Sequence, residues 1–208
     1  MTLVALGIFL LWLVLAFGVP MSRMRRRTGG RDAGLRISGP LQWCGEAAFG
    51  VIGLTGLANP VLDLLGALPR IDPLDHVPLR VLGLVVAVAG VAATVFAQLS
   101  MGASWRIGVD RAERTDLVTT GPFAVVRNPI FAAMLLTGLG LSLALPNFLS
   151  FTGLLLLYAT VSTLVRRVEE PYLTETHGAD YLGYARRVGR FFPGVGRLRR
   201  ADKSYPVG

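Results

Sequence analysis

The chain has 208 residues, of which 52% are hydrophobic and 16% are charged, a composition too apolar for an ordinary soluble domain. Its net charge is +8, but the basic residues flank long apolar runs and few aromatic residues lie among them. This arrangement fits membrane topology and argues against nucleic-acid binding. A single cysteine, Cys44, excludes an intrachain disulfide and a cysteine-based zinc site. We therefore expect one all-α, polytopic membrane domain over residues 1–208.

The first half of the chain predicts two apolar segments. Residues 2–19 form an uncharged run whose positive charges follow it, beginning at Arg23. A cleaved signal peptide carries these charges before its apolar core, so we expect an uncleaved span with its N-terminus outside. Residues 41–68 form the second segment, either one helix kinked near Asn59-Pro60 or a span followed by a re-entrant or interfacial piece. Glu46 in this segment lies either near the headgroups or against a partner or cavity.

Three further spans are expected at residues 79–101, 130–145 and 148–165. Pro146-Asn147 separates the last two, which predicts a tight reversal and an antiparallel helical hairpin. Gly138 and Gly140 lie inside an apolar helix, where glycine eases helix packing more often than it holds a phosphate. Residues 1–100 thus supply the N-terminal spans of the predicted bundle, and residues 101–193 form its candidate catalytic core.

The chain becomes polar after residue 165. Pro171 follows two adjacent carboxylates, Glu169 and Glu170, and is expected to end or kink the fifth helix. Gly178 resembles the C-terminal cap of a short helix. Residues 179–190 then predict a helix that packs on the membrane face or back onto the bundle. A basic tail covers residues 194–208.

The distribution of basic residues predicts the orientation. Six Lys and Arg lie in residues 22–39, four in 101–129 and nine after 165, while Arg70 and Arg80 alone lie between spans two and three. By the positive-inside rule, the three richer segments face the cytoplasm. We expect a multi-pass plasma-membrane protein of bacterial type, with its active site and C-terminus cytoplasmic.

Arg127-Asn128-Pro129 opens the fourth span. Asn is a favoured N-cap and Pro a favoured first helical residue, so free N–H groups and partial positive charge are expected here, where an anionic group binds well. The hairpin brings Glu169 and Glu170 to the same end. This cluster suits a zwitterionic ligand, although an arginine that simply pairs with Glu169 explains the same residues. His76 and His177 lie on opposite predicted sides, so we expect no shared metal site.

The ordered motif Gly121-Pro-Phe-x3-Arg127-Asn-Pro-x-Phe131-x-Ala133, followed by Glu169-Glu170-x2-Leu173-x3-His177-Gly-x2-Tyr181-x2-Tyr184-x2-Arg187-Val188, resembles the isoprenylcysteine carboxyl methyltransferase family. That family includes related phospholipid N-methyltransferases. The likeness covers about the last 100 residues, with a lead-in from Leu99 to Gly108. The family's usual Arg-His-Pro-x-Tyr-x-Gly differs here at three positions, namely Asn128, Phe131 and Ala133.

The resemblance implies a site for S-adenosylmethionine. Its cofactor-binding residues are expected to be Gly121, Pro122, Arg127, Asn128, Pro129, Glu169, Glu170, Tyr181 and Arg187. A carboxylate acceptor needs a cation to orient it, for which we expect Arg127. An amine acceptor must lose a proton, for which Glu169 is the expected base.

The resemblance favours a methyltransferase for a lipophilic small-molecule or lipidated acceptor, such as an isoprenylcysteine-type carboxylate, that enters from the bilayer. Three alternatives stay open at this stage. They are a phospholipid N-methyltransferase, an NADPH-dependent membrane sterol or steroid reductase, and a non-enzymatic protein whose basic face binds anionic lipid.

Overall fold

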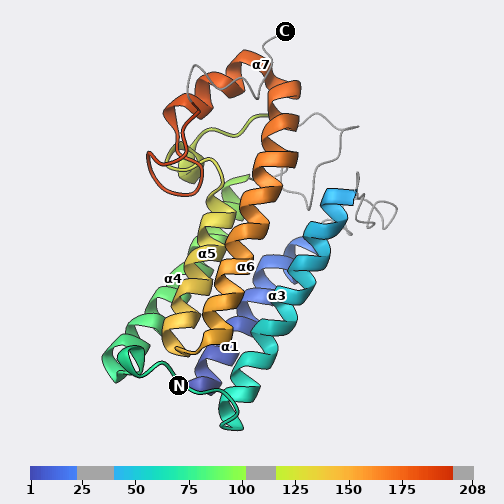
Figure 1. The fold of residues 1–208 in the computed structure, drawn as a ribbon. Helices are drawn as coiled ribbons and strands as arrows, with labels where there is room; N and C mark the ends of the chain where they lie inside the picture. Colours follow the sequence, from blue (N-terminus) through green and yellow to red (C-terminus); the bar gives the residue numbers. More distant parts are fainter. Residues whose placement is uncertain (23–39, 102–115, 199–208) are drawn as a thin grey trace.

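The computed structural model describes residues 1–22, 40–101 and 116–198 (Figure 1). Five apolar helices run side by side in it, and a smaller helical cap closes one end of the bundle. The helices are α1 (Thr2–Leu13), α3 (Pro40–Leu64), α4 (Val77–Met101), α5 (Pro129–Ala144), α6 (Phe148–Leu164) and α7 (Glu170–Arg187). Short helical turns add η1 (Val14–Gly18), η2 (Asp72–Leu74), η4 (Gly121–Ala124) and η5 (Val165–Glu169). The expected all-α bundle is confirmed. The Gly- and Arg-rich loop, most of the lead-in after Leu99 and the end of the basic tail lie outside the described residues.

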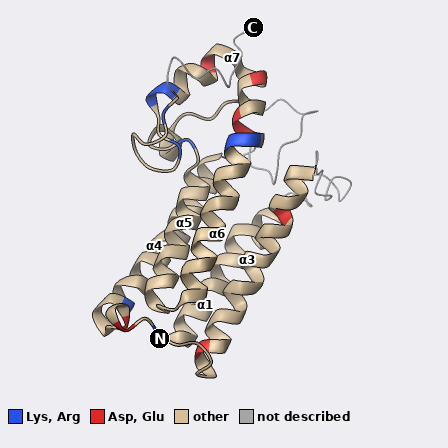
Figure 2. Cartoon of the chain, viewed as in Figure 1, with Lys and Arg blue, Asp and Glu red and all other residues tan. Residues whose placement is uncertain are grey.

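In the described part of the chain, four helical runs are long and apolar enough to cross a membrane, and α5 is a shorter apolar helix among them. Large apolar side chains point outward along the bundle, for example Leu54 at 69% and Leu155 at 68% exposure. Charged residues gather at the two ends of the bundle and are nearly absent between them (Figure 2). The protein is therefore a multi-pass membrane protein, because a soluble surface would not leave these side chains bare.

Helices α4 and α5 pack most closely, because glycines remove the side chains between them. A Cβ added to Gly83 would lie 2.7 Å from the Gly140 carbonyl oxygen and 2.6 Å from the Ala144 nitrogen. A Cβ on Gly140 would lie 2.6 Å from the Gly83 oxygen. This confirms the predicted packing role of Gly140. α5 also packs on α6, α3 packs along α6, and α1 contacts α3, α4 and α5.

The second apolar segment is one helix, α3, with Pro60 in its last turns, and not a span followed by a re-entrant piece. It ends at Leu64, and Gly66, just beyond this end, has a φ of +68° that suits the left-handed cap position. There the Ala67 nitrogen donates to the Leu62 oxygen at 2.9 Å. Glu46 is half-buried on the first turns of this helix.

The hairpin between α5 and α6 forms as predicted. Asn147 caps α6 by a reciprocal capping box with Ser150. Its Nδ2 also donates to Asn59 Oδ1 of α3 at 2.8 Å, and both asparagines are buried. Beside this turn, Arg70 pairs with Asp63 at 3.0 Å, and Arg80 donates to the Ala144 oxygen at 3.1 Å. Polar contacts thus tie together the end of the bundle that carries the N-terminus.

At the other end, the helical run does not stop at Pro171. α6 ends at Leu164, which we take as the end of the membrane-spanning segment. A π-helical turn, η5, follows and leads directly into α7. Pro171 lacks an N–H and cannot form the usual helical hydrogen bond. The wider π-helical turn just before it lets the helix continue without that bond. The sharp break lies instead at Gly178, with φ 52° and ψ −123°, as its cap-like position predicts.

Candidate functional site

The first part of the candidate site is the start of α5. η4 leads into an extended stretch in which Val126 forms a parallel bridge to Gly189. The Arg127 nitrogen donates to the Gly189 oxygen at 2.7 Å, and the Asn128 nitrogen donates to the Arg190 oxygen at 3.1 Å. The segment that follows α7 therefore fixes the residues where α5 begins. Asn128 occupies the predicted N-cap position, but its Nδ2 donates to the Arg190 oxygen at 3.3 Å and its side chain does not cap the helix.

The Arg127 side chain is buried, with only 2% exposed. Its Nη1 donates to the carbonyl oxygens of Ala185 and Val188 at 2.9 and 2.6 Å. Its Nη2 donates to Glu170 Oε1 at 2.6 Å and to the Gly196 oxygen at 3.2 Å. Nε is buried, and no described residue accepts a hydrogen bond from it. Arg127 thus links Glu170 at the start of α7 with the backbone at and after the end of α7. Its Nε remains as an additional donor.

Glu170 is the centre of this cluster. Besides Arg127, it accepts from Arg190 Nε on Oε1 and from Arg190 Nη2 on Oε2, both at 2.8 Å. Burial alone would raise the pKa of Glu170, but the hydrogen bonds and charges of Arg190 and Arg127 outweigh it and hold that pKa below its usual value. Glu170 is therefore a carboxylate whose charge two arginines compensate.

Glu169, the adjacent residue, lies in a different environment. It is half-buried, and no described residue forms a hydrogen bond or ion pair with it. Burial, and next the charge of Glu170, raise the pKa of Glu169 to about 7. The two adjacent carboxyls therefore differ. Glu170 is ionised and its charge is compensated by two arginines, whereas Glu169 is open to a cationic or proton-bearing ligand.

The remaining residues around the predicted site are either buried in the cap or exposed at its surface. Tyr181 is buried in the core of the cap, and Tyr184 donates from its hydroxyl to the Phe123 oxygen at 2.6 Å. Arg187 is exposed at the end of α7 and forms no ion pair with Glu170. Gly121, which has φ +59°, is exposed and Pro122 is half-buried, so both lie at the surface of the turn before α5.

Arg190 is the site residue that sequence reasoning missed. It lies three residues beyond Arg187, outside α7, where a turn closed by Gly194 and Gly196 at positive φ sends the chain back. Its basic character was visible in the sequence, but its distance of 20 residues from Glu170 gave no pattern to connect the two.

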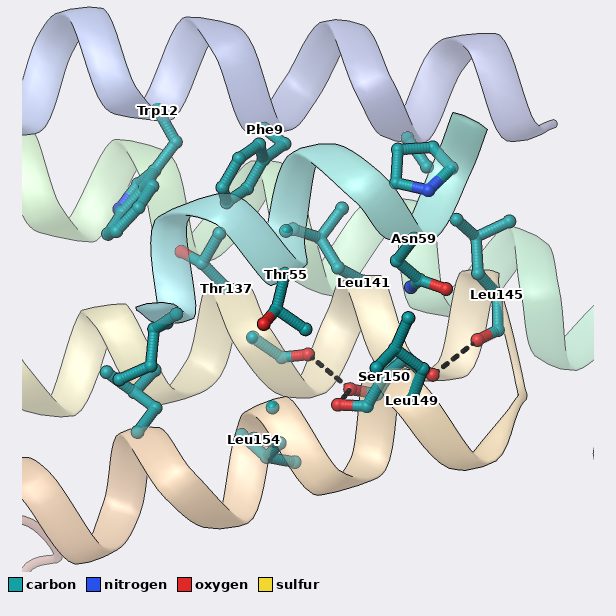
Figure 3. Close-up of a pocket in the computed structure, with 18 of the residues that line it drawn as sticks. Phe9, Trp12, Thr55, Asn59, Thr137, Leu141, Leu145, Leu149, Ser150 and Leu154 are labelled. Atoms are coloured by element: carbon teal, nitrogen blue, oxygen red, sulfur yellow. Dashed lines mark hydrogen bonds between the residues drawn. The ribbon is translucent and has the colours of Figure 1, made fainter. Parts of the chain in front are cut away.

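No group of three His, Cys, Asp or Glu side chains that could hold a metal occurs among the described residues. An apolar cavity of about 80 Å³ lies between α1, α3, α5 and α6 (Figure 3). It extends from the hairpin turn at Leu145 and Ser150 to Trp12 and Leu157. None of its lining residues belongs to the arginine–carboxylate cluster, so the two features are separate.

Two curated relatives share part of this chain. A cobalt-zinc-cadmium resistance protein, CzcN, from Cupriavidus metallidurans is 31% identical over 110 residues, which cover 52% of this chain and 50% of that protein. A nickel-cobalt-cadmium resistance protein, NccN, from Alcaligenes xylosoxydans xylosoxydans is 28% identical over 109 residues, with the same coverage. The matched part thus spans about half the length of each of these relatives.

The family model described as phospholipid methyltransferase matches residues 79–180. This match begins in α4, includes the α5–α6 hairpin, and ends in α7 beyond the two adjacent carboxyls. It therefore contains Arg127, Glu169 and Glu170, while Arg190 lies just after it. Residues 79–180 of this membrane-spanning chain therefore match the phospholipid methyltransferase family, a family of membrane methyltransferases.

Proposed function

We propose that this protein is an integral membrane methyltransferase that uses S-adenosylmethionine and acts on a lipophilic acceptor. The observation that carries the proposal is the half-buried carboxyl of Glu169, which has no partner among the described residues. It lies beside Glu170, whose charge two arginines compensate, and inside the segment that matches the family. A ligand with a cationic group and hydroxyls suits such a carboxyl, because a charge-assisted hydrogen bond would offset its burial.

The residues present fit this cofactor. Glu169 would accept from the cofactor's ammonium group or ribose hydroxyls. Arg127 Nε, the buried donor without a partner among the described residues, would donate to the cofactor's carboxylate or to an acceptor carboxylate. In the proposed site, Gly121, Pro122, Asn128 and Pro129 line one side, and Tyr181 and Arg187 the C-terminal side. Arg127 and Glu170 also hold each other in place.

When bound, the cofactor supplies a methyl group on a sulfonium, and transfer is an in-line displacement that depends mainly on positioning. We propose an acceptor of the isoprenylcysteine-carboxylate type or a similar lipidic acid. Such a carboxylate is already ionised at neutral pH, so the protein need only orient it. Arg127 is the cation in the right cluster to do so. The acceptor's apolar part would remain among the lipid-facing helices.

A phospholipid N-methyltransferase is the second candidate. The matching family carries that description, and Glu169, with a pKa raised to about 7, can accept the proton that an amine acceptor must lose. We further propose that the site faces the cytoplasm. Arg166 and Arg167 on η5 and Arg186 on α7 lie at its end of the bundle, whereas Arg70 and Arg80 contact Asp63 and Ala144 at the other end.

The test is calorimetric titration of the purified protein in lipid nanodiscs with S-adenosylmethionine, S-adenosylhomocysteine and NADPH. We expect binding of the first two, weakened about tenfold or more by Glu169→Gln, which loses a charge-assisted contact. Asp180→Asn, at an exposed position of α7, is the control and should bind as the wild type does. Absence of binding by both methionine-derived ligands would refute the proposal, and tight NADPH binding would favour a reductase.

A further inference from the structure

We propose that Arg190 is a positioning residue of the methyltransferase site, which holds Glu170 so that Glu169 alone presents its charge to the cofactor. The inference rests on the proposed function. Arg190 lies outside the segment that matches the family, and it hydrogen-bonds two residues of the proposed site, Glu170 and Asn128.

Arg190 joins three separate parts of the site. Its side chain places two nitrogens on the two oxygens of Glu170, each at 2.8 Å. Its carbonyl oxygen accepts from the Asn128 nitrogen at 3.1 Å, and its own nitrogen donates to the Val195 oxygen at 2.7 Å. One residue thus connects the start of α7, the start of α5 and the C-terminal turn.

The contact with Glu170 sets both position and orientation. Two parallel N–H···O bonds from a planar guanidinium fix the plane of a carboxylate, which a lysine ammonium cannot do. Glu169 shares the backbone of Glu170, so the orientation of the first turn of α7 also decides where the Glu169 carboxyl points. Arg127, which carbonyl oxygens hold on its other side, cannot supply this second contact.

The positive charge of Arg190 also influences the ionisation of Glu169, which it does not contact. Among the described residues, the charged groups near Glu169 are Glu170 on α7, Arg127 before α5, Arg190 after α7, and the exposed Arg166 and Arg167 on its own turn. Loss of Arg190 would leave more uncompensated negative charge next to Glu169. The ionised form of Glu169 would then be less favoured, and cofactor binding would require a higher pH.

The experiment compares Arg190→Gln, Arg190→Lys and the control Arg186→Gln, which removes the same charge from an exposed position of α7. S-adenosylmethionine binding is titrated in nanodiscs from about pH 5.5 to about 8.5. Each curve is compared with that of Arg186→Gln, because the cofactor's α-amino group, with a pKa of about 7.7–8.0, loses its proton equally in every variant. Thermal unfolding of the ligand-free protein is followed in parallel. For Arg190→Gln, we expect the midpoint of the affinity–pH curve to rise by roughly half a unit or more. For Arg190→Lys, we expect an unchanged midpoint and about tenfold weaker binding, because charge is kept and the fork is lost.

The outcomes separate the two proposals. If the wild type does not bind S-adenosylmethionine, the proposed function fails and this inference fails with it. If the wild type binds and Arg190→Gln has the same midpoint and affinity as Arg186→Gln, only the role of Arg190 is overturned. If Arg190→Gln does not fold, Arg190→Lys decides, and wild-type affinity in that variant overturns the inference.

Discussion

Replacement of Glu170 by Gln should destabilise the ligand-free protein strongly. The Glu170 side chain is 1% exposed and accepts charge-assisted hydrogen bonds from two described arginines, one from Arg127 at 2.6 Å and two from Arg190 at 2.8 Å. Gln keeps the volume and one oxygen but carries no charge. Both arginines then lose the anion that compensates them.

The two arginines differ in how they can respond. The Arg190 side chain is 12% exposed and can turn toward water, whereas Arg127 is 2% exposed and is held by the carbonyl oxygens of Ala185 and Val188. Most of the cost therefore comes from Arg127, which stays buried and uncompensated. Breaking one partner of a buried pair costs about 3–5 kcal/mol, and we expect Glu170→Gln to lie in this range.

The assay is reversible unfolding of the ligand-free protein in detergent, with Asp180→Asn as the control for loss of an exposed carboxylate on α7. The control should remain within roughly 0.5 kcal/mol of the wild type. A loss below roughly 1 kcal/mol for Glu170→Gln would show that the buried pair does not hold the cap in place, and the argument from burial would be wrong.

Three further predictions concern other parts of the chain. Affinity for S-adenosylmethionine should rise with pH up to about 7, the raised pKa of Glu169, because only its ionised form attracts the cofactor's ammonium; calorimetry of Glu169→Gln should give a flat profile. Gly140→Ala should cost about 1–3 kcal/mol in an unfolding titration, because its Cβ would lie 2.6 Å from a backbone oxygen, whereas Gly50→Ala, with no neighbour within 4 Å, should not. Asn147→Ala should cost about 1–3 kcal/mol in the same assay, because α6 loses its cap and buried Asn59 its donor; equal stability would contradict this.

The bundle was predictable because its signals are local. The apolar run at residues 148–165 became Phe148–Leu164, and the run at 79–101 became Val77–Met101. Pro146-Asn147 and Gly178 mark breaks that depend only on neighbouring backbone. At Pro171 the local rule was incomplete, because a proline can follow a π-turn without ending the helix.

The candidate site was less predictable because its contacts are long-range. Arg127 and Glu170 were expected at one place, and the structure brings them together, but as partners of each other. The second arginine that compensates Glu170, and so makes it differ from Glu169, is Arg190 and not Arg187. α7 ends at Arg187, which remains exposed, while the turn after it returns Arg190 to the site. No helical or strand periodicity carries that information.

The different treatment of two adjacent carboxyls connects the fold with the proposed chemistry. A buried ion pair adds little stability compared with apolar residues of similar size, so the three-residue cluster of Arg127, Glu170 and Arg190 needs a reason other than stability. We infer that the reason is geometric. The cluster fixes the start of α5 against the start of α7, and it compensates Glu170 so that its neighbour alone carries an open charge. A cationic ligand then meets one carboxylate in one orientation, as an in-line transfer requires.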